Sequence, residues 1–121
     1  MNIVHLMHQA QAQLEQSDID FNEQVELVLT ILRSQRCLPF IRAKLNGHVH
    51  RQVAAALVLA HRAGQSVDVS TRHLGHYHWH GISTCLINYL DKLLKTGMLL
   101  GSDNKAKGKL TLGPVLQAYL N

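Results

Sequence analysis

The stretch from 82 to 112 constrains the fold of this chain more than any other part of the sequence. It opens after a turn signal at Gly81, carries leucines at helical spacing and reaches a stop signal at Gly97. Two short apolar runs then flank a lysine-rich polar stretch that has a glycine near each end. This pattern predicts a helix over about 82–96, followed by an antiparallel hairpin with a basic loop at about 101–109.

The residues upstream and downstream add further elements. One apolar helical face ends at Gly64 and is made by four residues: Val49, Val53, Leu57 and Ala60. A strand-like run at 67–69 follows, and Ser70 can cap a short helix that continues to about His76. Pro114 suits the first turn of a closing helix. The expected order is therefore helix, strand, two helices, hairpin and helix.

Four stretches of this half of the chain resemble the second helix, turn, recognition helix and wing of the winged helix-turn-helix superfamily of bacterial regulators. They are Ser70-Thr71-Arg72-His73-Leu74, Gly81-Ile82-Ser83-Thr84, the run from Tyr89 to Leu99, and Lys109-Leu110-Thr111-Leu112-Gly113. The resemblance implies a mainly α-helical fold with a small β-hairpin wing. It also implies a DNA-binding domain over 48–121, acting in transcription regulation.

Residues 1–47 are expected to form an N-terminal helical extension. The first helix, over 2–16, has a narrow apolar stripe: Ile3, Met7, Ala10 and Leu14. A second helix begins at the capping-box pair Asp20 and Glu23 and ends near Pro39. A helix as short as the first is unstable alone, so its stripe must pack on the body of the domain or on a second copy. We expect the second arrangement, a homodimer paired through this stripe.

Charge is divided unevenly along the chain. Residues 1–26 hold five Asp or Glu and no Lys or Arg, whereas residues 27–121 hold all twelve basic residues against three acidic ones, a balance of +9. The basic segment coincides with the part that resembles the winged-helix superfamily. This distribution is typical of a protein that binds a polyanion, and it favours double-stranded DNA as the partner.

Roles in DNA binding follow from side-chain chemistry and from the expected recognition helix. The candidates for reading base edges in the major groove are Ser83, Thr84, Ile87 and Asn88. Asn88 is the best of these, because an amide can pair with adenine through two hydrogen bonds. The candidates for phosphate contacts are Arg72, Lys92, Lys95, Lys105, Lys107 and Lys109, and His48 and His50 beside Arg51 could add to them.

A histidine cluster and a different class of partner give two alternatives. Four histidines lie within eight positions: His73, His76, His78 and His80. Three of them would share one helical face at a spacing that suits zinc or nickel, which would make the protein a metal-responsive repressor. Surface histidines without metal are the simpler interpretation. The same fold could instead serve as a protein-protein interaction module.

Other classes of function find little support in the sequence. There is no phosphate-binding glycine loop, nucleophile elbow or metalloprotease motif, so we expect no enzyme and no cofactor. No apolar run reaches the roughly 20 residues of a membrane span, and no signal peptide is indicated. Cys37 and Cys85 lie within apolar helical patterns, as free cysteines often do. A cytoplasmic protein is expected.

Overall fold

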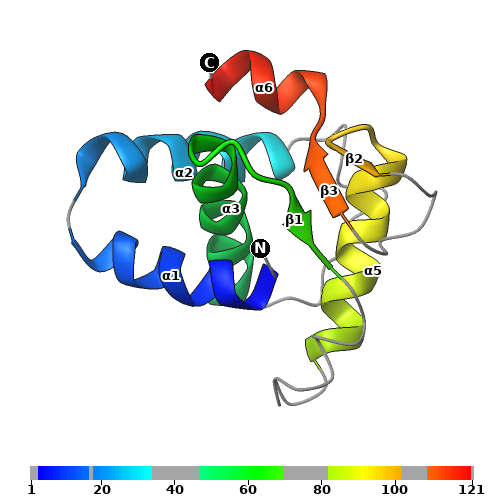
Figure 1. Ribbon diagram of the computed structural model, residues 1–121, viewed down its shortest axis with the longest axis horizontal. Coiled ribbons are helices and arrows are strands. Elements are labelled where there is room, and N and C mark those ends of the chain that lie inside the picture. Colours follow the sequence, from blue (N-terminus) through cyan, green and yellow to red (C-terminus); the bar gives the residue numbers. More distant parts are fainter. Residues whose placement is uncertain (1–2, 17, 34–46, 70–81, 102–108, 121) are drawn as a thin grey trace.

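The computed structural model describes residues 3–16, 18–33, 47–69, 82–101 and 109–120. Within them the chain is mainly helical and carries a small antiparallel sheet of three strands. In chain order the elements are α1 (Ile3–Glu15), α2 (Ile19–Leu32), α3 (Gly47–Arg62), β1 (Val67–Asp68), α5 (Ile82–Lys95), β2 (Leu99–Gly101), β3 (Lys109–Leu112) and α6 (Pro114–Leu120). Figure 1 shows α1 and α2 on either side of α3, and the strands between α3 and α5.

Helix α2 begins and ends earlier than the sequence pattern indicates. The Asp18 carboxylate accepts a hydrogen bond from the Phe21 backbone N–H over 3.0 Å, so Asp18 is the N-cap. The expected capping box at Asp20 is wrong by two positions. The helix closes at Leu32 with Arg33 as its C-cap, ahead of the end expected near Pro39.

Helix α3 lies at the centre of the helical part of the fold. Six successive residues, 53–58, are buried, and three of them are alanines. A surface helix buries only one stripe, so burial on every side means that other elements pack around α3. Helices α1 and α2 both pack closely against it. The small alanine side chains let the backbones of these helices approach.

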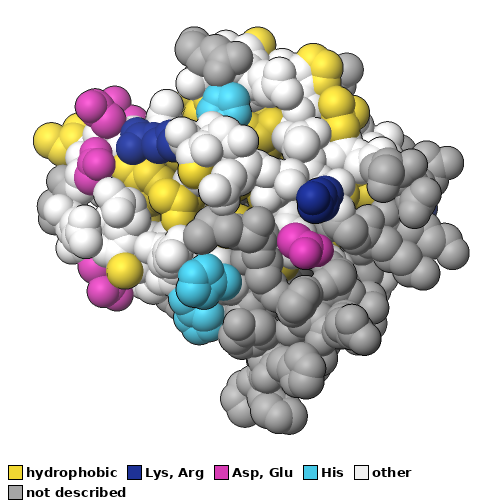
Figure 2. Space-filling model, in the orientation of Figure 1, with side chains coloured by type: hydrophobic (Ala, Val, Ile, Leu, Met, Phe, Trp, Pro, Cys, Tyr) yellow, Lys and Arg dark blue, Asp and Glu magenta, His cyan; other side chains and the backbone are white. Residues whose placement is uncertain are grey.

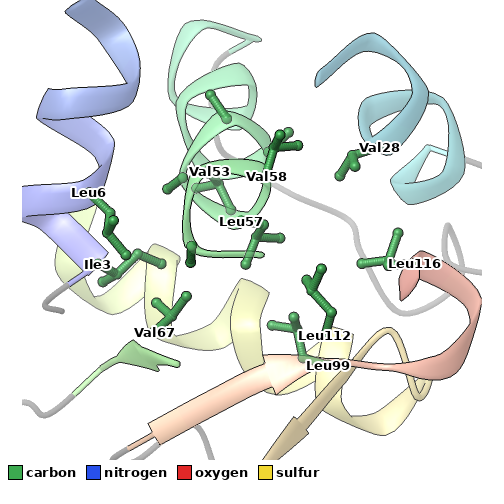
Figure 3. Close-up of a cluster of buried hydrophobic side chains, with 14 of the residues drawn as sticks. Ile3, Leu6, Val28, Val53, Leu57, Val58, Val67, Leu99, Leu112 and Leu116 are labelled. Carbon is green, nitrogen blue, oxygen red and sulfur yellow. The ribbon is translucent and has the colours of Figure 1, made fainter. Parts of the chain in front are cut away.

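The apolar stripe of α1 packs inside the chain. Ile3, Met7 and Ala10 are fully buried and Leu14 is partly buried, in the absence of any second copy. Figure 3 shows Ile3 pointing into a cluster with side chains of α3 and β1. The expected dimer contact through this stripe is therefore wrong, because the body of the same chain already covers it.

The sheet joins segments that are far apart in the sequence. Its strand order is β1-β3-β2, with Val67 opposite Leu110 and Leu100 opposite Thr111. Along β3 the side chains alternate between exposed and buried, as expected for a strand with one face on the core. Strand β1 thus ties the end of α3 to the β2–β3 hairpin (Figure 1).

Both α3 and α5 end at a glycine in the left-handed region. Gly97 has φ +77°, and hydrogen bonds from Gly97 to Leu94 and from Met98 to Leu93 close α5 as a Schellman motif. Gly64, at φ +65°, closes α3 in the same way. The predicted stops at these two glycines are confirmed.

One hydrophobic core serves the whole described structure. The connected cluster of buried side chains includes residues from all five helices and all three strands. Figure 3 shows Val28 of α2, Leu57 of α3, Leu99 of β2 and Leu116 of α6 pointing into this shared centre. The boundary expected between 47 and 48 therefore does not separate two cores.

Candidate nucleic-acid interface

Helix α5 presents one polar face beside a buried apolar one. Tyr89, Leu90 and Leu93 are buried, while Asn88 and Lys95 are exposed. Two half-buried residues, Asp91 and Lys92, lie three and four positions after Asn88 and complete the same face. The residue with the strongest base-reading chemistry thus reaches solvent from the middle of a regular helix.

The remaining expected DNA-binding residues divide into three groups. Lys109 is exposed at the start of β3. Ser83, Thr84 and Ile87 lie on the first half of α5, but their side chains fall outside the described part of the structure. Wholly outside the described residues lie Arg72, Lys105 and Lys107, together with the histidine cluster His73, His76, His78 and His80.

Acidic neighbours offset part of the basic charge of the described candidate residues. Lys109 is the cross-strand partner of Asp68 in the β1–β3 pair, so the two side chains are neighbours on one face of the sheet. Asp91 precedes Lys95 by four positions on α5, the spacing at which helical side chains of opposite charge meet. Sequence spacing alone reveals the second pair but not the first, which depends on strand register.

The positive charge of the chain is concentrated outside the described residues. Those residues hold six Lys or Arg and seven Asp or Glu, a balance of −1, whereas segments 34–46, 70–81 and 102–108 together hold +5. Figure 2 shows acidic side chains gathered at the end of the molecule formed by α1 and α2. The acidic end thus lies away from α5 and the hairpin (Figure 1).

Two arginines of α3 are engaged with α2. Arg51 lies 2.5 Å from the Glu26 carboxylate. Arg62 donates to the Gln24 side-chain oxygen over 2.7 Å and lies 4.0 Å from the Asp18 carboxylate. Its guanidinium also stacks 5.2 Å from the centre of the Phe21 ring. These contacts hold α2 against α3, so Arg51 does not belong to the candidate interface.

A buried polar contact connects α3 with α5. The Tyr89 hydroxyl and His50 Nε2 lie 2.5 Å apart, and the rings meet edge to face with centres 5.0 Å apart. Burial, followed by the nearby Arg33 charge, lowers the pKa of His50 below its ordinary value, which favours the neutral ring. The suggestion that His50 contacts phosphate is therefore wrong. No local pattern predicts this pair, which joins residues 39 positions apart.

A pocket of about 190 Å³ lies elsewhere, between the end of α3, the sheet and α6. Gln117 of α6 lines this pocket, and its side-chain amide donates a hydrogen bond to the Leu112 carbonyl oxygen over 2.7 Å. Five buried apolar side chains form its walls: Leu57, Ala60, Val67, Leu110 and Leu112. Polar residues line the rest of the pocket, among them His61, Ser66 and Thr111.

In the described part of the chain, no three His, Cys, Asp or Glu side chains are placed to hold a metal ion together. Nor does any described helix combine the length and the apolar composition required to cross a lipid bilayer.

Comparison with known proteins gives no match: no family model, curated protein or solved structure resembles this chain significantly.

Proposed function

We propose that this protein is a winged-helix DNA-binding regulator of transcription. The observation that carries the proposal is the arrangement of five elements, in which α3 leads into β1, α5 leads directly into the β2–β3 hairpin, and β1 pairs with β3. This order and pairing agree with the winged-helix interpretation of the sequence. In it α5 is the recognition helix and the hairpin is the wing.

In this proposal the exposed face of α5 enters the major groove. Asn88 would pair with adenine, and Ser83, Thr84 and Ile87 on the preceding turns would contact neighbouring bases or the backbone. Side chains at 88, 92 and 95 share the face, so Lys92 and Lys95 would meet phosphates flanking the base that Asn88 reads.

Affinity would come mainly from the phosphate contacts. The described candidates include three lysines offset by two carboxylates, Asp68 and Asp91, so the additional charge of Arg72, Lys105 and Lys107 is required for strong binding. Acidic α1 and α2 lie away from this face, which avoids repulsion by the DNA backbone.

A homodimer remains part of the proposal, because two half-sites raise the affinity of a small regulator. It requires a surface other than the α1 stripe. The large apolar side chains that remain exposed among the described residues are Ile19, Leu100 and Tyr119.

Fluorescence anisotropy with labelled duplexes tests the proposal. The triple variant Lys105→Ala, Lys107→Ala, Lys109→Ala should weaken binding to all duplexes and make the log-log salt dependence shallower by about 0.9 for each lost contact. Asn88→Ala should cost roughly 1–3 kcal/mol on a duplex selected from a random pool and little on unselected DNA. Gln9→Ala, on the exposed side of α1, is the matched control and should change neither the affinity for DNA nor its salt dependence.

The alternative is a protein-protein interaction module. The carboxylates beside Lys95 and Lys109 favour it over a purely electrostatic DNA surface. If the unmodified protein does not bind duplex DNA at low salt, where non-specific binding should be measurable, the regulator proposal fails and this alternative takes its place.

A further inference from the structure

A buried hydrogen bond between Tyr89 and His50 joins α5 to the helical layer. Helix α5 is in close backbone contact with β2, which follows it in the chain, whereas α1 and α2 pack closely on α3. Tyr89 reaches from α5 to His50 on α3 and forms a hydrogen bond inside the protein. Both side chains are buried, with 2% and 8% of their surfaces exposed, so water does not compete for this bond.

A directional contact at this place restricts how α5 can turn about its own axis. The apolar contacts of Leu90 and Leu93 contribute burial but little orientation, because the hydrophobic effect is non-directional. The bond between Tyr89 and His50 requires a defined position of the hydroxyl group, and the edge-to-face rings add a second geometric requirement.

Tyr89 is also the immediate neighbour of Asn88 in the helix. Successive side chains of an α-helix point about 100° apart, because a turn contains 3.6 residues. The direction of the buried Tyr89 therefore determines the direction of the exposed Asn88.

We propose that His50 and Tyr89 are positioning residues that set the rotation of α5 and thereby the direction in which Asn88 faces DNA. The positioning role itself does not depend on the proposed function, since the orientation of α5 is a property of the free protein. Only its effect on how Asn88 meets DNA rests on that function. Neither side chain needs to touch DNA. The suitability of His50 for this role is supported by its burial, which favours a neutral ring with an unprotonated nitrogen that can accept a hydrogen bond from the Tyr89 hydroxyl.

The test uses changes that remove the bond but little volume. Tyr89→Phe deletes the hydroxyl alone, and His50→Leu removes the ring nitrogens. His50→Gln is the conservative variant, because its amide can still bond the Tyr89 hydroxyl. Tyr119→Phe makes the same chemical change at a tyrosine of α6 that is 58% exposed, and serves as the matched control.

Amide hydrogen exchange provides the readout that does not depend on DNA. Tyr89→Phe and His50→Leu should accelerate exchange in α5 by about three- to tenfold, the range for one lost hydrogen bond, and leave the most protected amides of α1 and α3 unchanged. His50→Gln and Tyr119→Phe should match the unmodified protein. Equal acceleration in all the helices would show a general loss of stability and overturn the proposal, as would unchanged exchange in α5.

Binding to the selected duplex is the second readout, with all variants compared well below their unfolding temperatures. Tyr89→Phe should weaken it about three- to tenfold without changing the salt slope, because no phosphate contact is lost. Undiminished affinity in this variant would refute the link to Asn88. If the unmodified protein binds no DNA while exchange in α5 responds as expected, the positioning role stands and the regulator function falls.

Discussion

The helical layer of α1, α2 and α3 differs from the region of α5 and the hairpin in what its charged side chains do. In the layer, Arg51 and Arg62 are engaged with side chains of α2, and the neighbouring surface is acidic. On α5 and β3, Asn88, Lys95 and Lys109 extend into solvent from elements whose other face is buried. The first region uses its polar groups to hold helices together, whereas the second exposes them to solvent.

The two regions also tolerate change differently. Helix α3 is surrounded by other elements, so substitution at almost any position over 53–58 must disturb the core. On α5, by contrast, Asn88 and Lys95 are exposed and can vary without affecting packing. Variants can therefore separate folding from binding.

Removal of residues 1–16 should unfold the protein. Ile3, Leu6 and Met7 are fully buried, and losing three such side chains costs about 5–9 kcal/mol at about 1.5–3 kcal/mol each, much of the 5–15 kcal/mol that stabilises a typical domain. The apolar side of α3 would also become exposed. Far-ultraviolet circular dichroism during heating should show little residual helix and no cooperative transition.

The control for this deletion is the double variant His5→Ala, Gln9→Ala. It removes two exposed side chains of α1, which are joined to each other by a hydrogen bond of 3.2 Å, and should change the free energy of unfolding by no more than about 0.5 kcal/mol. A truncated chain that remains folded but changes from dimer to monomer in sedimentation would contradict the packing of α1 and restore the dimer contact.

Gly113→Ala should destabilise the junction between α5 and the hairpin. A Cβ atom at this position would lie 1.9 Å from the Gly97 carbonyl oxygen, and since that atom belongs to the backbone it cannot rotate away. Gly113 also donates its backbone N–H to the Met98 carbonyl over 2.8 Å. We expect a loss of about 1–3 kcal/mol in urea unfolding, the range for overpacked sites.

Gly64→Ala separates this clash from the conformational cost of replacing a glycine. Nothing lies within 4 Å of its Cβ position, so the cost arises from φ +65° alone, about 1 kcal/mol. If Gly113→Ala proves no more destabilising than Gly64→Ala, the close approach to Gly97 is not a constraint on the fold.

Acidification should weaken the contact between the two regions through His50. Burial and then Arg33 lower the pKa of this ring in the folded protein below the ordinary value of 6.5, while the unfolded chain keeps that value. The resulting stabilisation is present above pH 6.5 and is lost as the pH falls through the lowered folded value. The groups that act on the ring are the charge of Arg33, the C-cap residue of α2, and the hydroxyl of Tyr89 from α5.

The measurement compares urea unfolding of the unmodified protein and His50→Gln at neutral and mildly acidic pH. The other eight histidines are common to both, so the difference between the two pH dependences isolates His50. The unmodified protein should lose more stability on acidification than the variant. Equal losses would mean that His50 titrates alike in the folded and unfolded chains.

Elements encoded by local signals were predicted closely. The helix expected over about 82–96 is Ile82–Lys95, and the helix expected over 2–16 is Ile3–Glu15. Hydrophobic spacing and glycine stops act within a few residues, so they do not depend on the rest of the fold. The exposed position of Asn88 followed from the same periodicity.

Errors arose where two residues have the same capping chemistry, or where a contact joins residues far apart in the sequence. Asp18 and Asp20 both have cap chemistry, and the structure uses the first. The apolar stripe of α1 indicated a surface that must be buried, but it did not indicate which element or chain buries it. His50 was interpreted from its neighbour in sequence, Arg51, whereas its partner is Tyr89.

The sequence by itself determined which segments become helices and strands, where α3 and α5 end, and which face of α5 is polar, because these depend on backbone geometry and on the period of nearby side chains. Only the tertiary structure decided that α1 covers α3 within one chain, that Asp68 lies beside Lys109, and that Tyr89 bonds His50. Each of these contacts joins residues far apart along the chain. Burial and strand register select such partners, and neither is fixed until the whole core has formed.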